Sequence, residues 1–157
     1  MIRGIHHAAI STHDLDRLVA FYRDIVGFEV VYESEWKNDP FIDSLIGLEG
    51  SAARQMMLKA GGCYLELFEY SAPAAREAER LRPCDRGYTH ICLDVVGIEE
   101  EWERLTRAGA VFVRRPGGFE QIKAVYGRDP DGNIIEIQET SEDSAMALER
   151  LGPLVSR

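Results

Sequence analysis

Two histidines and two glutamates stand at matched places in the two halves of this 157-residue chain. His7 and His90 each open an apolar segment, and Glu66 and Glu136 each lie inside a later apolar segment of the same half. A carboxylate within an apolar strand is costly to bury unless a cation pairs with it. Two neutral imidazoles and two carboxylates would match the charge of one divalent ion, and Ni²⁺, Co²⁺, Zn²⁺, Mn²⁺ and Fe²⁺ all accept such donors. We therefore predict that these four residues bind one metal ion.

Taken one at a time, the same residues have ordinary structural explanations. A single strand histidine is usually hydrogen-bonded at the core or its rim, and a single strand glutamate usually faces solvent or pairs with an arginine. The metal prediction therefore depends on all four residues occurring together. His6 is expected to point to the face opposite His7, and Cys92 is expected to be a small core residue.

Helical patterns follow each histidine at the same distance. In the first half the pattern begins after Asp14 and ends near Gly27, and in the second it begins at Gly97 and ends near Gly109. Aspartate is a favoured N-terminal cap and glycine a favoured C-terminal one. Each half is thus predicted to start with a strand, followed by a helix.

Turn signals then divide the rest of each half into strands. Gly61-Gly62 and Asp131-Gly132 each separate two apolar segments, as hairpin turns do. Glu66 stands four residues after Gly62, and Glu136 stands four residues after Gly132. Each half is therefore predicted to have the order strand, helix and three strands, with its glutamate on the last strand.

The halves differ mainly in an insertion of the first half, at about residues 34–53. Its apolar side chains, which include Trp36, predict a lid or specificity loop over residues 36–46, with a dimer contact as the alternative. A short helix is predicted over residues 74–81 of the linker, and another near residues 145–151 of the tail.

Composition excludes several classes of protein. The formal net charge is −9 and the pI about 4.9, which argues against nucleic acid and against an anionic membrane surface as partners. The sequence has no apolar run of spanning length and no signal-peptide pattern at its start. Its three cysteines contain no C-x-x-C pair, which favours a reducing, cytoplasmic location.

Several motifs together resemble those of the vicinal oxygen chelate superfamily, which includes glyoxalases, bleomycin-resistance proteins and extradiol dioxygenases. The motifs lie at residues 7–10, 14–15, 21–22, 27–28, 64–67, 87–91 and 129–136. The resemblance implies an α+β fold in which two paired βαβββ modules form a cupped mixed sheet around a metal site. It implies one domain over residues 1–139, with modules 1–70 and 88–139 joined by a linker at 71–87, followed by a tail at 140–157. It also implies a homodimer.

The resemblance is nearest to the branch of glyoxalase I and methylmalonyl-CoA epimerase. His7, Glu66, His90 and Glu136 fall on the four metal-ligand positions of glyoxalase I. This implies a metal-dependent lyase or isomerase that abstracts a proton next to a carbonyl and forms a metal-bound enediolate. Either Glu136 or Glu66 would act as the base, and the sequence leaves that choice open.

The expected substrate is a small organic molecule with hydrophobic parts. Tyr64, Phe68 and Tyr126 are predicted to line its pocket together with Trp36. Two other functions stay open at this stage. One is an Fe²⁺-dependent extradiol dioxygenase that cleaves catechol-like rings, and the other is a small-molecule binding or resistance protein without turnover.

Overall fold

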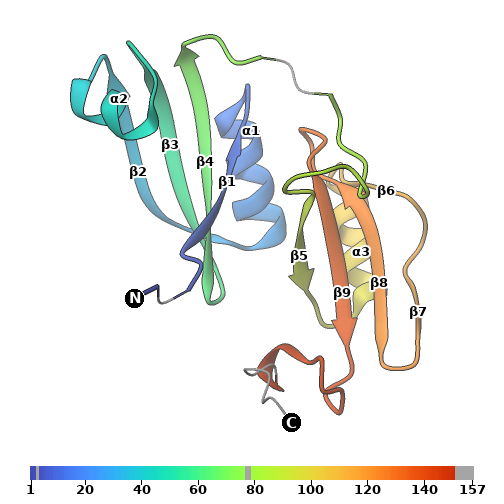
Figure 1. Cartoon of the computed structure of the whole chain (residues 1–157). Coiled ribbons are helices and arrows are strands. Elements are labelled where there is room, and N and C mark those ends of the chain that lie inside the picture. The colour runs from blue at the N-terminus through green and yellow to red at the C-terminus, as the bar shows by residue number, and fades with distance from the viewer. Residues whose placement is uncertain (3, 77–78, 151–157) are drawn as a thin grey trace. The chain divides into compact units, whose positions relative to one another are not determined.

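The structure is a computed structural model, and it describes residues 1–2, 4–76 and 79–150 (Figure 1). Its helices and strands are, in chain order, β1 (His7–Ser11), α1 (Leu15–Ala20), the π-helix η1 (Phe21–Val26), β2 (Glu29–Lys37), α2 (Pro40–Ile46), β3 (Ala52–Ala60), β4 (Cys63–Ala72), β5 (His90–Asp94), α3 (Ile98–Arg107), β6 (Val111–Phe112), β7 (Gly117–Phe119), β8 (Ile122–Arg128), β9 (Ile134–Thr140) and the 3-10 helix η2 (Leu148–Arg150). No helix in these ranges is long and apolar enough to cross a membrane.

The chain divides into two compact units, Met1–Glu79 and Arg80–Arg157. The first contains a four-stranded sheet in the order β1-β4-β3-β2, with β1 parallel to β4. The second contains a sheet in the order β5-β9-β8-β6, with β5 parallel to β9 and with β7 paired to β8. The predicted α+β class and the order strand, helix and three strands are confirmed in both units, with α2 and β7 as additions.

The first helix begins where the sequence predicts. The Asp14 side chain accepts a hydrogen bond from the backbone N–H of Arg17 at 3.0 Å, and so caps one of the free N–H groups of α1. After Ala20 the helix continues as the π-helix η1, which ends at Gly27. Gly27 has a φ of 94°, a left-handed conformation that glycine adopts without the strain of a side chain.

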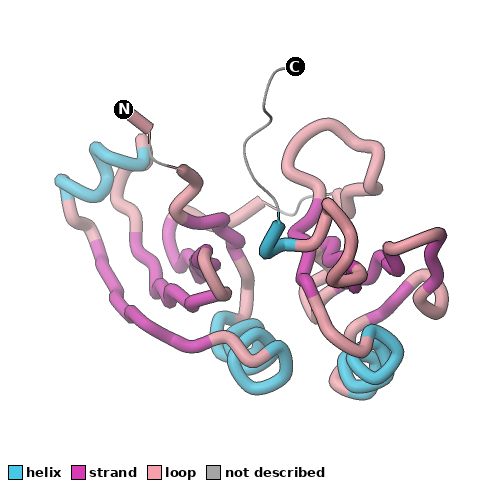
Figure 2. Tube along the Cα trace, turned by 90° about the horizontal axis from the view of Figure 1, so that it is seen from below, coloured by secondary structure: helices cyan, strands magenta, loops and turns pink. Residues whose placement is uncertain are grey.

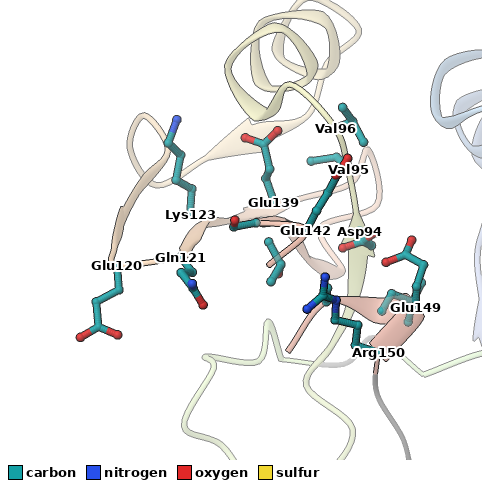
Figure 3. A pocket seen from close by; sticks show the side chains of 14 residues that line it. Asp94, Val95, Val96, Glu120, Gln121, Lys123, Glu139, Glu142, Glu149 and Arg150 are labelled. Carbon is teal, nitrogen blue, oxygen red and sulfur yellow. The ribbon is translucent and has the colours of Figure 1, made fainter. Parts of the chain in front are cut away.

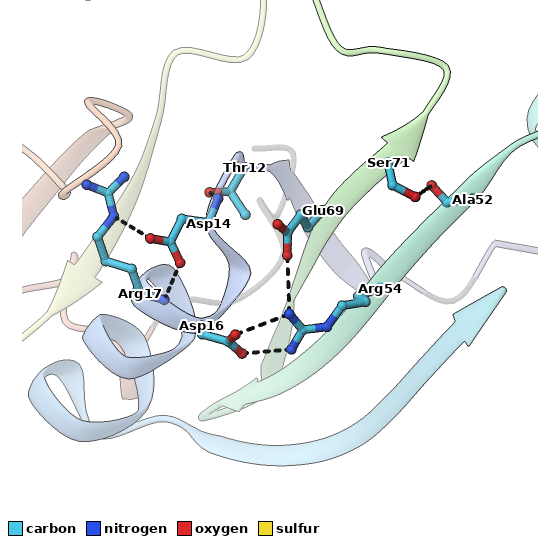
Figure 4. Close-up of polar contacts among 8 residues, drawn as sticks. All are labelled: Thr12, Asp14, Asp16, Arg17, Ala52, Arg54, Glu69 and Ser71. Carbon is cyan, nitrogen blue, oxygen red and sulfur yellow. Dashed lines mark hydrogen bonds and ion pairs between the residues drawn. The ribbon is translucent and has the colours of Figure 1, made fainter. Parts of the chain in front are cut away.

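Each long helix lies against one face of the sheet in its own unit (Figure 2). In the first unit an ion-pair network also holds α1 to the strands (Figure 4). The guanidinium of Arg54 on β3 donates to Asp16 of α1 at 2.7 Å and lies 3.4 Å from Glu69 of β4. The hydrogen bond from Arg54 holds the pKa of Asp16 below its usual value. Charge pairing therefore supports the helix at its exposed edge, while apolar packing supports it beneath.

The last strand of each unit carries its glutamate between two buried apolar residues. Leu65 and Leu67 of β4 are buried, and so are Ile135 and Ile137 of β9. The glutamate between each pair of apolar residues therefore projects from the opposite face, as the sequence predicts. The apolar residues hold the strand against the core, so they fix the direction in which the carboxylate points.

A residue of β9 caps the helix of the second unit. Gly97 precedes α3 with a φ of 73°, and it has no side chain to accept a bond from the helix start. Its backbone N–H donates instead to the carboxylate of Glu139 at 2.6 Å. A negative charge at a helix N-terminus also interacts favourably with the helix dipole. The capping bond links the start of α3 directly to the strand that carries Glu136.

A buried carboxylate organises the turn between β8 and β9. Asp129 is only 3% exposed. Its Oδ1 accepts from the backbone N–H groups of Asp131 and Asn133 at 3.0 and 2.9 Å. Its Oδ2 accepts from the amide of Asn133 at 2.8 Å. The turn therefore closes around one side chain and sets the start of β9.

Residues 36–46 do not form the irregular loop that the sequence suggests, and their role as a lid or specificity segment, or as a dimer contact, stays a prediction. Trp36 lies on β2, where it pairs with Ala53 of β3, and residues 40–46 form α2. Asp39 caps α2 through its side chain, and Gly47 ends the helix in a left-handed conformation. The capping residues at both ends therefore determine that this segment is helical, although its side chains are largely apolar. None of the α2 residues is buried.

Three other local predictions also change. The described residues of the predicted linker helix, 74–76 and 79–81, are not helical, and residues 77–78 lie outside the described residues. The tail forms the 3-10 helix η2 at Leu148–Arg150 in place of a helix over 145–151, and residue 151 lies outside the described residues. Cys92 is exposed, so the expectation of a core residue is wrong. It shares the face of β5 that carries His90.

Candidate metal centre

The two sheets use the same register to bring a histidine beside a glutamate. In the first unit Ala9 pairs with Glu66, and in the second Cys92 pairs with Glu136. The histidine stands two residues before the pairing residue in both cases. Because residues two apart on a strand share a face, each imidazole projects on the same side of the sheet as its carboxylate.

In the first unit this register produces a close contact. Nε2 of His7 lies 3.2 Å from Oε2 of Glu66. The glutamate is 8% exposed, whereas the histidine is more open to solvent. The other carboxylate oxygen, Oε1, accepts a hydrogen bond from the amide of Gln55 on β3. Both oxygens of this buried carboxylate are therefore engaged, as a buried charge requires.

The remaining nitrogen of His7 is also engaged. Nδ1 of His7 lies 2.9 Å from Nδ1 of His6, and the His6 ring stacks on Tyr64 at a centroid distance of 5.1 Å. The expectation that His6 points away from His7 is wrong. His6 precedes β1, so the alternation of side chains along a strand does not apply to it.

The second unit repeats the contact with different neighbours. Nε2 of His90 lies 3.3 Å from Oε2 of Glu136, and Nδ1 of His90 lies 2.9 Å from the hydroxyl of Thr89. Tyr126 is directly opposite Glu136 on β8, and its hydroxyl lies 3.5 Å from Nε2 of His90. The phenol ring contacts the imidazole edge-on at a centroid distance of 5.0 Å.

The carboxylates make nearby acids harder to deprotonate. Partial burial, followed by the charge and the hydrogen bond of Glu136, raises the pKa of Cys92 to about 12. The same causes raise the pKa of Tyr126. In the first unit, burial and the charge of Glu66 raise the pKa of Tyr70. Each pair therefore sits in a negative environment that would favour a bound cation.

The donors of each pair fit a metal ion. In both units Nδ1 of the histidine is held by a neighbouring polar group, and Nε2 faces a carboxylate oxygen. This is how an imidazole ligand is usually oriented by its surroundings.

Each unit supplies two such donors. Within the described ranges, no three side chains of His, Cys, Asp or Glu are gathered in a way that could hold an ion. Binding of one ion by all four residues therefore stays a prediction.

The predicted pocket residues fall into three groups. Trp36 and Phe68 belong to an aromatic cluster with Tyr70, with centroid distances of 5.8–6.1 Å. The indole N–H of Trp36 donates to the hydroxyl of Ser51 at 2.8 Å. Tyr64 stacks on His6, and Tyr126 contacts His90.

Sequence reasoning missed Tyr70, although a signal was present. Residues 64, 66, 68 and 70 alternate along β4, so Tyr70 shares the face of Glu66. Sequence reasoning also missed Gln55 and Thr89, because their roles depend on register and side-chain direction.

A separate groove with a volume of about 680 Å³ lies in the second unit (Figure 3). It is lined by residues 94–96, 120–121, 123, 139–142 and 147–150. None of the predicted site residues lines it. The capping residue Glu139 does, so this groove borders the start of α3.

Comparison with known proteins gives the family. A model of the Glyoxalase/Bleomycin resistance protein/Dioxygenase superfamily matches residues 4–137. The chain belongs to this superfamily. Its members are mostly metal-dependent enzymes, and they include lyases, epimerases and transferases.

Relatives of this superfamily member carry different activities. The chain is 33% identical over 113 residues to a 2-epi-5-epi-valiolone epimerase from Actinomyces sp., a match that covers 70% of the chain and only 61% of the epimerase. It is 23% identical over 137 residues to a probable lactoylglutathione lyase from Synechocystis sp., covering 86% of the chain and 94% of the lyase.

Solved structures agree with the fold. A glyoxalase family protein from Bacillus cereus superposes with a TM-score of 0.82 at 21% identity, covering 90% of this chain and 96% of that one. The fosfomycin resistance protein FosX from Listeria monocytogenes, solved with Mn(II) and sulfate, has a TM-score of 0.59 at 19% identity. That match covers 91% of this chain and 97% of FosX. FosX is thus a protein of the same fold whose structure contains a divalent metal ion.

Proposed function

We propose that this protein is a metal-dependent lyase or isomerase that removes a proton next to a carbonyl group of a small organic substrate. The observation that carries the proposal is the repeated register, which places an imidazole beside a carboxylate in both sheets. The similarity to an epimerase and to a probable lactoylglutathione lyase supports the same kind of chemistry.

His7, Glu66, His90 and Glu136 would hold one divalent ion, such as Ni²⁺, Co²⁺, Zn²⁺, Mn²⁺ or Fe²⁺. When bound, the ion would supply Lewis acidity that polarises the substrate carbonyl and makes the neighbouring C–H more acidic. The histidines contribute neutral donors, and His6 and Thr89 orient them through Nδ1. The carboxylates contribute the negative charge that balances the ion.

A glutamate oxygen would take the proton from carbon and hold it as a carboxylic acid. Delivering the proton to a neighbouring carbon gives an isomer, whereas an epimer forms when a second proton donor, such as a water molecule, protonates the same carbon from its opposite face. The side chains of Glu66 and Glu136 are only 10% and 13% exposed.

The aromatic side chains would enclose the apolar part of the substrate. Trp36 and Phe68 share the face of the sheet that carries Glu66, and Tyr126 lies opposite Glu136. Pockets for small molecules are generally lined by such apolar and aromatic groups around a few polar ones. Organic substrates with an apolar part next to a carbonyl are therefore favoured.

Hydrogen exchange in D₂O tests the proposal. The Co²⁺-loaded protein is incubated with a glutathione hemithioacetal, methylmalonyl-CoA and 2-epi-5-epi-valiolone, and deuterium at the carbon next to the carbonyl is measured by NMR. We expect incorporation with one probe, and a loss of at least about 100-fold in Glu66→Ala and Glu136→Ala. Glu142→Ala, which removes an exposed carboxylate, is the matched control.

Two outcomes would contradict the proposal. One is the absence of stoichiometric metal after loading, which would favour a binding protein without turnover. The other is O₂ consumption with a catechol by the Fe²⁺-loaded protein that survives Glu66→Ala, which would favour a ring-cleaving dioxygenase.

A further inference from the structure

A chain of hydrogen bonds crosses the whole sheet of the first unit. The hydroxyl of Ser34 on β2 donates to Oε1 of Gln55 on β3 at 2.9 Å, and the amide nitrogen of Gln55 donates to Oε1 of Glu66 on β4. Oε2 of Glu66 faces Nε2 of His7 on β1 at 3.2 Å. The sheet order β1-β4-β3-β2 makes each step a contact between neighbouring strands (Figure 1).

The register explains why Gln55 reaches the carboxylate. Ser34 pairs directly with Gln55, and Gln55 pairs with Phe68, two residues beyond Glu66 on the same face. Diagonal neighbours at this spacing are within reach of a long side chain. A carboxylate only accepts hydrogen bonds, so the amide must present its N–H group to Glu66 and its oxygen to Ser34.

The second unit lacks this contact at the equivalent place. Ala124 pairs with Gln138, as Gln55 pairs with Phe68, and a methyl group has no donor to offer. Tyr126 is directly opposite Glu136, where Met57 is opposite Glu66. The two glutamates therefore differ: an amide holds the first in one orientation, and the second has acidic O–H and S–H groups beside it.

We propose that Gln55 is a positioning residue that fixes Glu66 as a permanent metal ligand and prevents it from acting as the base. The inference rests on the proposed function. A carboxylate that turns from the ion to take a substrate proton would have to break the bond from Gln55 as well. Glu136 is bonded instead by the Tyr126 hydroxyl and the Cys92 thiol, whose O–H and S–H groups can rotate with it, unlike an amide that is held at both ends, so proton transfer falls to Glu136. Ser34 supports the arrangement by holding the oxygen end of the amide.

Cobalt binding by the full chain tests this role. Gln55→Met keeps the length and volume of the side chain but removes the donor. Gln138→Met is the matched control, because Gln138 is also on a site strand but donates to Thr140. Co²⁺ is titrated into each metal-free protein and followed by its visible absorption, and the melting temperature of each metal-free protein is recorded by circular dichroism.

We expect wild type and Gln138→Met to bind one Co²⁺ with equal affinity. Gln55→Met should bind about 10- to 100-fold more weakly, as is usual when a group that orients a ligand is lost, with an altered absorption band. Its metal-free melting temperature should also fall by several degrees, because the buried Glu66 carboxylate loses a hydrogen bond, so the absorption band of the bound Co²⁺ is the measurement that separates the two roles. A purely structural role would lower the melting temperature and leave the absorption band unchanged.

Two results overturn the inference, and they are distinguishable. Equal Co²⁺ affinity and equal spectra for wild type and Gln55→Met would refute the role of Gln55 and leave the proposed function standing. Failure of wild type itself to bind one Co²⁺ would remove both.

Discussion

Replacing Asp129 should destabilise the second unit in graded steps, because its two oxygens accept different bonds. Oδ1 accepts two backbone N–H groups and Oδ2 accepts the amide of Asn133. Asp129→Ala removes all three bonds and leaves two backbone donors to be hydrated in a tight turn. Asp129→Asn keeps an oxygen for the backbone donors but turns an NH₂ group toward the Asn133 amide. Asn133→Ala removes only the bond to Oδ2.

The magnitudes follow from the bond counts. A hydrogen bond to a charged group contributes roughly 1.5–3 kcal/mol on deletion, and removing the buried carboxylate also recovers its own desolvation. We therefore expect Asp129→Ala to lower the free energy of unfolding by about 3 kcal/mol, well below the sum of three bonds. Asn133→Ala, which removes one bond to the charged group, should lower it by about 1.5 kcal/mol, and Asp129→Asn by about the same amount.

Urea unfolding measured by tryptophan fluorescence can isolate the second unit. The chain has two tryptophans, and a Trp36→Phe background leaves Trp102 of α3 as the reporter. Glu142→Ala serves as a matched loss of an exposed carboxylate and should change stability by less than about 0.5 kcal/mol. If Asp129→Ala were no more destabilising than Asn133→Ala, the backbone bonds would contribute nothing and the reasoning would be refuted.

Three further predictions concern other residues. In the metal-free protein, alkylation of Cys92 at pH 8 should be about 1,000-fold slower than alkylation of a thiol with a pKa of 9, because a pKa of about 12 leaves little thiolate. Glu136→Gln should accelerate the reaction, and peptide mass spectrometry measures both rates. The lowered pKa of Asp16 means that its bond to Arg54 stabilises the fold above the usual aspartate pKa and that this stabilisation disappears as the pH falls through the lowered value. Asp16→Asn should therefore destabilise at pH 7, and this destabilisation should shrink as the pH falls below the usual aspartate pKa; a destabilisation that does not change with pH would contradict this. Trp36→Phe keeps the ring contacts but loses the hydrogen bond to the Ser51 hydroxyl. Chemical denaturation should therefore show that the free energy of unfolding falls by about 1 kcal/mol, and an unchanged value would mean that the bond does not stabilise the fold.

The sequence was sufficient to predict the strand faces and turns that carry the candidate donors. Glycine-containing turns mark the hairpin ends, and Leu65 and Leu67 must enter the core, so Glu66 must face away from it. The same two signals hold for Glu136. Local rules of this kind act within a few residues, which is why the pattern alone predicts them.

Contacts between distant segments could not be predicted in this way. The bond from Gln55 to Glu66 depends on the pairing of β3 with β4 and on side-chain length. The contact of His6 with His7 arises because the chain before β1 does not follow strand alternation. The helix α2 was different, because Asp39-Pro40 and Gly47 are readable capping signals that its apolar content obscured.

Because Glu139 of β9 accepts a hydrogen bond from Gly97, the start of α3 should respond to movements of β9. Glu136 and Glu139 lie three residues apart on β9 and so emerge from opposite sides of the sheet. Any sliding or tilting of that strand on ligand capture would also strain the bond from the Gly97 amide. Deuterium uptake at the Gly97 amide, or a shift of its ¹⁵N resonance, would then report ligand binding on the face of the sheet that carries Glu136. No probe would have to be attached on that face.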